Sequence, residues 1–163
     1  MIEKSSRHSK IIGNFGEHYI ANWLSRSGFE VILVDHTGID IVAYNKKMNK
    51  RLGITVKSRT RNEGTESTFV NIFHDNISDR QKVLEACDTF ACEPWIGIYI
   101  ETSEAADIYL LSLDHYDKTY SHRPDSKSGN WKMDLKNKQK YEEDNAVKYI
   151  KILFDLKKWD WVC

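Results

Sequence analysis

Two apolar segments of alternating pattern, joined by a short polar turn, constrain the fold of this chain more than any other feature. Residues 39–44 are IDIVAY and residues 51–59 are RLGITVKSR, with the polar NKKMNK between them. This pattern is typical of an antiparallel β-hairpin. Because successive side chains of a strand point to opposite faces, Thr55 shares its face with Lys57. In a suitable register, Asp40 of the first strand can meet Lys57 of the second.

The segments around this hairpin predict a mixed α/β fold. Apolar residues recur at helical spacing over residues 14–27 and 79–91. Short segments rich in β-branched and aromatic residues predict three further strands, at residues 29–34, 95–101 and 107–114. Residues 141–157 fit a helix and also tolerate a strand. The order predicts a central mixed sheet of about five strands flanked by helices.

Length and composition are those of one ordinary globular domain. The chain has 163 residues, of which 24 are basic and 24 are acidic, so any surface for nucleic acid must be local. The three cysteines lack metal or redox spacing, which favours a reducing, cytoplasmic compartment. We expect neither secretion nor a membrane span, because no apolar run approaches the roughly 20 residues that a span needs.

Four short motifs occur in a fixed order around the hairpin. They are G-x-x-G-E at residues 13–17, G-F-x-V at 28–31, G-I-D at 38–40 and V-K-S-R at 56–59. In this order they resemble the PD-(D/E)XK nuclease superfamily, especially its Holliday-junction-resolvase-like and restriction-endonuclease-like members. The resemblance implies a restriction-endonuclease-like fold in a single domain over residues 1–163. Its motif core would span residues 14–113, followed by an extension over residues 114–163.

The resemblance also implies a metal site on the hairpin. Asp40 matches the principal metal ligand, Glu17 the carboxylate on the first helix, and Lys57 the lysine of the motif. The backbone carbonyl of Val56 would add another ligand. Mg²⁺ prefers hard oxygen ligands and is usually bound through one or two carboxylates plus substrate phosphate. We therefore expect an endonuclease that hydrolyses DNA phosphodiester bonds with Mg²⁺ or Mn²⁺, with Lys57 assisting the attacking water.

Thr55 departs from the pattern of the superfamily, because it occupies the position of the second acid. A hydroxyl in place of a carboxylate removes one negative charge and one strong oxygen ligand. An acid of the following loop, Glu63 or Glu66, would be placed to compensate. A catalytically degenerate protein that keeps the fold to bind DNA or a protein partner is equally consistent with Thr55.

Two of the candidate residues also have a structural interpretation. Asp40 and Lys57 could form a plain cross-strand ion pair, which contributes only about 0–1 kcal/mol when exposed. With Asn14 as the N-cap, Glu17 would occupy the third helical position, where an acid stabilises the start of a helix. The glycines of the same segment, Gly13 and Gly16, would let the sheet approach the helix closely.

Basic residues continue from the proposed centre along the chain. Arg59 and Arg61 follow Lys57 at alternate positions. We expect them to contact the backbone phosphates of a nucleic acid partner, DNA. Resolvases of this fold act as dimers, so the resemblance implies a homodimer, although no dimer surface is identifiable in the sequence.

Overall fold

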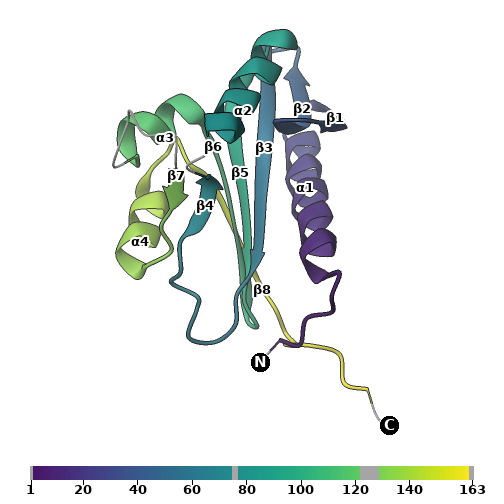
Figure 1. The fold of residues 1–163 in the computed structure, drawn as a ribbon, viewed down its shortest axis with the longest axis vertical. Coiled ribbons are helices and arrows are strands. Elements are labelled where there is room, and N and C mark those ends of the chain that lie inside the picture. The colour runs from purple at the N-terminus through teal and green to yellow at the C-terminus, as the bar shows by residue number, and fades with distance from the viewer. Residues whose placement is uncertain (1, 75–76, 122–128, 162–163) are drawn as a thin grey trace.

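The computed structural model describes residues 2–74, 77–121 and 129–161, and it leaves the side chains of residues 77 and 78 undescribed. The chain folds into a mixture of helices and strands (Figure 1). Their order is α1 (His8–Arg26), β1 (Glu30–His36), β2 (Ile39–Asn45), β3 (Lys50–Thr60), β4 (Val70–Phe73), α2 (Ile77–Thr89), β5 (Glu93–Glu101), β6 (Ala105–Ser112), α3 (Leu113–Thr119), β7 (Gly129–Trp131), α4 (Leu135–Glu143) and β8 (Lys148–Leu153).

A mixed sheet forms the centre of the molecule, as the sequence predicts. Its strand order is β1-β2-β3-β5-β6-β8; β3 and β5 are parallel, and every other neighbouring pair is antiparallel. The expectation of about five strands is corrected to six, and β4 and β7 form a separate two-stranded sheet. The predicted order of a helix, three strands, a second helix and two further strands is confirmed for the six-stranded sheet up to β6, with β4 inserted before the second helix. Among the described helices, none combines the length and apolar character needed to cross a bilayer.

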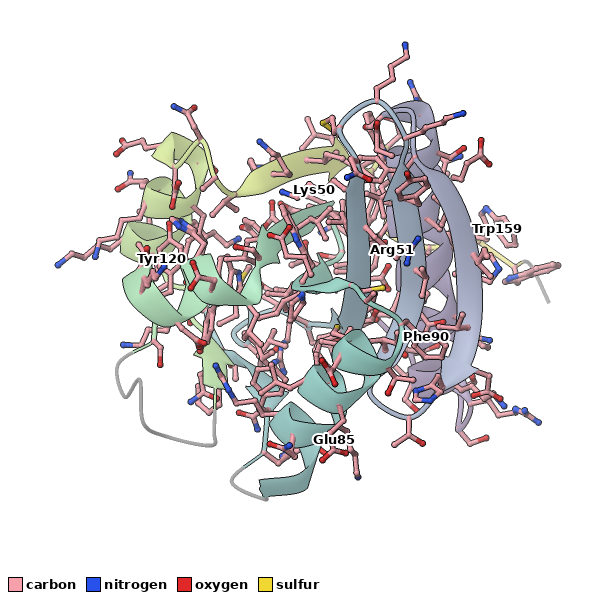
Figure 2. All side chains as sticks on the ribbon, turned by 90° about the horizontal axis from the view of Figure 1, so that it is seen from above. Lys50, Arg51, Glu85, Phe90, Tyr120 and Trp159 are labelled. Carbon is pink, nitrogen blue, oxygen red and sulfur yellow. The ribbon has the colours of Figure 1, made fainter. Side chains whose placement is uncertain are left out.

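The two faces of the sheet bury separate apolar clusters. On one face α1 packs Ile20 and Leu24 against Ile54 of β3. On the other face, the cluster under α2 includes Val83 and Ile98. Figures 1 and 2 show α1 and α2 on opposite sides of β3. Each helix can therefore present polar side chains to the same end of the β2–β3 pair from a different side.

The first helix begins earlier than its sequence pattern suggests. It starts at His8, with Arg7 as N-cap, so the prediction of Asn14 as N-cap is wrong. The physical reason is a buried stripe at every fourth position, Ile12, Gly16, Ile20 and Leu24, which extends the apolar face one turn toward the N-terminus. Glu17 consequently lies inside the helix, and the helix-capping interpretation of Glu17 is wrong as well.

Only one of the two predicted close approaches between α1 and the sheet occurs. A Cβ atom on Gly16 would lie 2.1 Å from Ser58 Oγ and 3.0 Å from Tyr99 Cβ, whereas a Cβ atom on Gly13 would meet nothing within 4 Å. Gly16 therefore sets the distance between α1 and β3. Gly13 faces open space, and its packing role in the prediction is wrong.

The strand interpretation holds for part of residues 141–157, and the helix interpretation is wrong. In β8, Ile150 and Ile152 pack into the cluster on the α1 face. On the opposite face, the rings of Tyr149 and Tyr109 stack with centroids 5.0 Å apart. The contacts of Ile150 and Ile152 on one face and of Tyr149 on the other match the period of a strand and not that of a helix. β8 thus adds the sixth strand from the region after the motif core.

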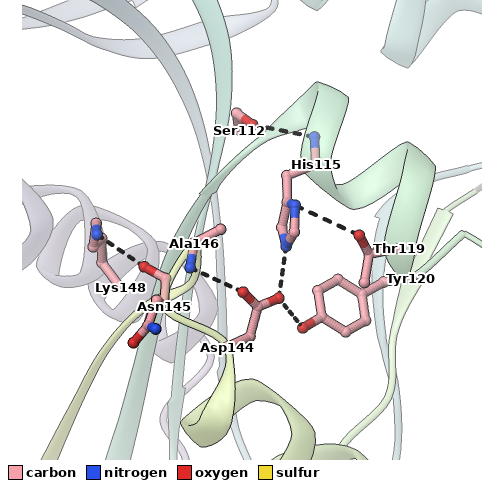
Figure 3. A network of polar contacts seen from close by, with 8 residues as sticks. All are labelled: Ser112, His115, Thr119, Tyr120, Asp144, Asn145, Ala146 and Lys148. Atoms are coloured by element: carbon pink, nitrogen blue, oxygen red, sulfur yellow. Dashed lines mark hydrogen bonds and ion pairs between the residues drawn. The ribbon is translucent and has the colours of Figure 1, made fainter.

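A polar network holds the connection from α4 to β8 (Figure 3). Asp144 Oδ2 accepts hydrogen bonds from the Tyr120 hydroxyl and from His115 Nε2, the latter at 2.6 Å, and Asp144 Oδ1 accepts one from the Ala146 N–H at 2.9 Å. Desolvation raises the pKa of Asp144, but the hydrogen bonds from Tyr120 and His115 outweigh it, so the pKa lies below its ordinary value. The ionised carboxylate therefore joins α3 to the start of β8.

Replacing each α1 glycine by alanine should change stability in opposite directions. We expect Gly16→Ala to lower the free energy of unfolding by about 1–3 kcal/mol, because the added methyl group overlaps Ser58 and Tyr99. Gly13→Ala should raise it by about 0.5–1 kcal/mol, because alanine is the better helix former and meets no neighbour. Urea denaturation measures both, and equal effects would contradict the packing described.

Removal of the Asp144 charge should destabilise the protein at neutral pH. We expect Asp144→Asn to lower the free energy of unfolding by about 1 kcal/mol, since this partly exposed carboxylate accepts charge-assisted hydrogen bonds. Its folded-state pKa is lowered, so its contribution is present above the ordinary carboxyl pKa of about 4 and is lost as the pH falls further. Urea denaturation from pH 7 to pH 3 should show the variant and wild type converging.

The matched control for this prediction is Asp114→Asn. Asp114 and Lys118 form an exposed ion pair within α3, with each side chain 72% exposed. This variant should change stability little at any pH. An equal loss in both variants would show that the Asp144 network has no special role.

Candidate functional site

The candidate site begins where β2 leaves β3. The two strands pair from Asn45 and Lys50 as far as Ile41 and Ile54. Beyond this point the Asp40 side chain replaces the missing strand contact, because its Oδ2 accepts a hydrogen bond from the Val56 N–H at 2.6 Å. In the described part of the chain, residues 55–60 therefore have a strand neighbour only at β5. This segment is the free edge of β3.

A glycine holds Asp40 at this position. Gly38 has a φ of +110°, in the region that favours glycine. A Cβ atom at Gly38 would lie 2.3 Å from the Lys82 carbonyl oxygen of α2. The turn before β2 consequently packs directly on α2, and this contact fixes where Asp40 enters the site.

The structure brings Asp40, Thr55 and Lys57 into one pocket, which we call the Asp40 pocket. Its volume is about 240 Å³. Ten residues line it, and they come from the turn before β2, from β2, β3, the end of β4 and α2: Thr37, Gly38, Asp40, Thr55, Val56, Lys57, Phe73, Asp79, Lys82 and Val83. The alternation of β3 places Thr55 and Lys57 on one face, as the sequence predicts.

Two charged residues of the Asp40 pocket were missed by sequence reasoning. Asp79 lies in the first turn of α2, and Lys82 lies about one turn later. An acid at that position has the ordinary appearance of a helix-stabilising residue. No local motif connects residues 79–82 to the hairpin, and only the packing of α2 against Gly38 brings them there.

Asp40 and Lys57 share the pocket without a direct ion pair, as no oxygen–nitrogen distance between them is within 4.0 Å. Burial raises the pKa of Asp40, whereas the Val56 N–H, the Lys57 charge and the Thr55 hydroxyl act in the opposite direction. The net pKa lies above the ordinary value. The plain ion-pair interpretation is therefore not what the structure shows.

Glu17 approaches Asp40 from α1. It is half-buried and does not line the Asp40 pocket. Burial raises the pKa of Glu17, and the negative charge of Asp40 raises it further. The two carboxylates are thus within electrostatic range of each other at the start of β2. A bound cation would relieve both the desolvation and the repulsion.

The oxygen ligands available from the protein meet only the minimum that a magnesium ion needs. Carboxylates are available from Glu17 and Asp40. The Val56 carbonyl adds an oxygen on the free edge, since the N–H and C=O of one strand residue point to the same side and this N–H points to Asp40. Glu63 and Glu66 do not line the pocket, so they do not replace the acid missing at Thr55. Over the described residues, no three His, Cys, Asp or Glu side chains are grouped for metal binding.

The two arginines expected at phosphates lie outside the Asp40 pocket. Arg59 donates from Nη1 to the Ser58 carbonyl at 2.7 Å, and Arg61 donates from Nη2 to the Phe69 carbonyl at 2.9 Å. Desolvation lowers the pKa of Arg61, and the neighbouring charge of Arg59 lowers it further. Both guanidinium groups are half-buried and follow Lys57 along the free edge of β3.

The chain matches the solved structure of Hjc, a Holliday junction resolvase from the archaeal hyperthermophile Archaeoglobus fulgidus, with 22% sequence identity and a TM-score of 0.42. The match covers 54% of this chain and 64% of the resolvase chain. No protein-family model and no curated protein sequence matches. The description of the fold therefore rests on the strand order and register.

Neutralising Asp40 should not destabilise the protein. The folded-state pKa of Asp40 is raised, so its ionised form lowers stability at neutral pH and this penalty fades as the pH falls through that pKa. Asn has no such charge, and its Oδ1 can still accept from the Val56 N–H. We expect Asp40→Asn to unfold at an equal or higher urea concentration than wild type at pH 7. A clear loss of stability would show that the carboxylate is chiefly structural.

Proposed function

We propose that this protein is a metal-dependent endonuclease that hydrolyses DNA phosphodiester bonds at the free edge of β3. The observation that carries the proposal is the raised pKa of both Glu17 and Asp40 at the point where β2 leaves β3, with Lys57 in the pocket beside Asp40. Two adjacent, partly desolvated carboxylates beside a lysine form an arrangement suited to phosphoryl chemistry.

Each side chain has a defined role in this proposal. Asp40, Glu17 and the Val56 carbonyl would hold Mg²⁺ or Mn²⁺. When bound, such an ion lowers the pKa of a coordinated water and stabilises charge on phosphate oxygens. Lys57 orients the attacking water and balances negative charge that develops on the phosphate. The Thr55 hydroxyl acts to lower the pKa of Asp40 and so favours the ionised carboxylate that a metal needs.

The DNA would run along the free edge of β3. Arg59 and Arg61 continue this edge beyond Lys57 and would hold backbone phosphates, which fixes the register of the strand without reading its bases. We further propose a homodimer, because cleavage of two strands of a branched or duplex substrate needs two such sites.

A non-catalytic function is the second candidate, and one observation favours it. Thr55 is 4% exposed in the Asp40 pocket, where the superfamily pattern has an acid, and no group of three metal-binding side chains occurs among the described residues. A protein of this kind would bind DNA or a protein partner through the same edge and would leave the phosphodiester bond intact.

Cleavage assays separate the two functions. Purified protein is incubated with single-stranded, duplex and branched DNA in Mg²⁺ or Mn²⁺, beside Asp40→Ala and Lys57→Ala. We expect cleavage by wild type and a loss of at least about 100-fold in each variant, the usual effect of removing a group that stabilises transition-state charge. Equal cleavage by all three proteins would indicate a contaminant.

Restoring the missing acid tests the position of Thr55. In Thr55→Asp, a third carboxylate beside Asp40 should raise the affinity for Mn²⁺, measured by calorimetry in wild type and variant. The matched control is Thr55→Asn, which introduces an amide of the same shape but no charge. If wild type binds DNA without cutting it and Thr55→Asp cuts, the non-catalytic function is the correct one.

A further inference from the structure

A second pocket lies between the start of α1 and the last residues of β3. Figure 1 shows these two segments at the same end of the molecule. We call this second pocket the serine pocket; its volume is about 340 Å³. It is lined by the residues Lys4, Ser5, Ser6, His8, Ser9, Ile12, Ser58, Arg59 and Thr60. Five of these nine carry hydroxyl groups, two are permanent cations, one is a histidine, and none is a carboxylate. This composition suits a phosphate or another oxyanion.

The first turn of α1 adds to the positive potential of the serine pocket. The helix has 19 residues, and its first turn contains no acidic residue. The N-cap residue, Arg7, makes no side-chain hydrogen bond to the helix. The positive end of the helix dipole is therefore not neutralised by its own side chains, and it would favour an anion.

Ser58 gives an independent indication of a missing ligand. The residue is 7% exposed, and its Oγ has no hydrogen-bond partner among the described residues. Buried hydroxyl groups are normally paired, because leaving one unpaired is unfavourable. Ser58 lines the pocket, and its Oγ lies against Gly16 of α1, so rotation about its Cα–Cβ bond would let the hydroxyl donate to an acceptor bound in the pocket.

Hydrogen bonds hold the cationic side chains of the pocket in place. Lys4 donates from Nζ to the Thr60 carbonyl at 2.7 Å. The Thr60 hydroxyl donates to Glu101 Oε1 at 2.8 Å, so its contact of 2.7 Å with His8 Nε2 requires His8 to donate. Glu101 is the nearby acid, and hydrogen bonds from Thr60 and Tyr99 hold it outside the residues that line the pocket.

We propose that the serine pocket binds a backbone phosphate of the nucleic acid strand that is cut at the Asp40 pocket, a few nucleotides away from the reacting phosphodiester. This inference rests on the proposed function. The two pockets use consecutive residues of β3 but lie on opposite faces of the sheet, since Lys57 faces α2 and Ser58 faces α1. A nucleic acid strand that contacts both pockets would therefore cross the free edge of β3. From Val56 to Thr60 a strand spans about 13 Å, which corresponds to about four phosphates along one strand of a duplex.

Binding of inorganic phosphate tests the pocket without DNA. Proton–nitrogen NMR spectra are recorded during a phosphate titration, with chloride at the same ionic strength as reference. We expect the largest shifts at Ser9, Ser58 and Thr60. Lys4→Ala should weaken binding on the order of ten-fold, as one charge-assisted contact is lost. Lys10→Ala is the matched control, because Lys10 is an exposed lysine in the first turn of α1 that does not line the pocket.

Ser58→Ala distinguishes a binding role from a structural one. Removing an unpaired buried hydroxyl should leave stability unchanged or raise it, while phosphate binding should weaken. A structural role would lower stability and leave phosphate binding unaffected. Shifts scattered over all lysines, or equal affinity in Lys4→Ala and Lys10→Ala, would overturn the proposal.

The affinity for an oligonucleotide, measured in EDTA so that no cleavage occurs, tests whether the serine pocket contacts DNA. Fluorescence anisotropy over a range of KCl concentrations should give a slope of log affinity against log salt that is smaller by about 1 in Lys4→Ala and in Arg59→Ala. Cleavage by wild type with unchanged slopes in these variants would reject the serine pocket and keep the proposed function. Phosphate binding at Ser58 without any DNA affinity would reject the proposed function and this role in DNA binding together.

Discussion

The hydrogen bond from the Val56 N–H to Asp40 Oδ2 marks the point where β2 separates from β3, and the rest of the site depends on it. Because a side chain and not a strand occupies this position, residues 55–60 of β3 keep an open edge. The same bond holds the carboxylate against the backbone in a partly desolvated place. The free edge and the perturbed acid therefore have one structural cause.

Two glycines place helices close to this edge from opposite faces. Gly16 lets α1 approach β3, and Gly38 lets the turn before β2 rest on the backbone of α2. As a result, Glu17 reaches Asp40 from one side while Asp79 reaches the pocket from the other. The burial that raises the carboxyl pKa values follows from these close contacts, and it favours a cation or a phosphate-bound metal at the edge.

The sequence predicted the site best where charged motif residues lie within a strand whose alternation fixes the face of each side chain. Alternation along β3 placed Thr55 and Lys57 on one face, and the ordered motifs indicated that Glu17 would approach Asp40. Contributions from distant segments could not be predicted, because no local pattern records them: Asp79 enters the pocket only through the packing of α2. The structure of residues 148–153 was ambiguous from the sequence for a different reason, since a helix and a strand would both place the apolar residues of this segment on a buried face.

A diffraction experiment on crystals soaked in Mn²⁺ tests the central claim most directly, because anomalous scattering locates the ion independently of any activity. We predict one strong anomalous peak at the start of β2, within coordination distance of Asp40, Glu17 and the Val56 carbonyl oxygen. We predict no such peak in Asp40→Asn crystals. A well-ordered site without a peak at saturating Mn²⁺, or a peak that persists in Asp40→Asn, would contradict a metal-dependent centre on the free edge of β3.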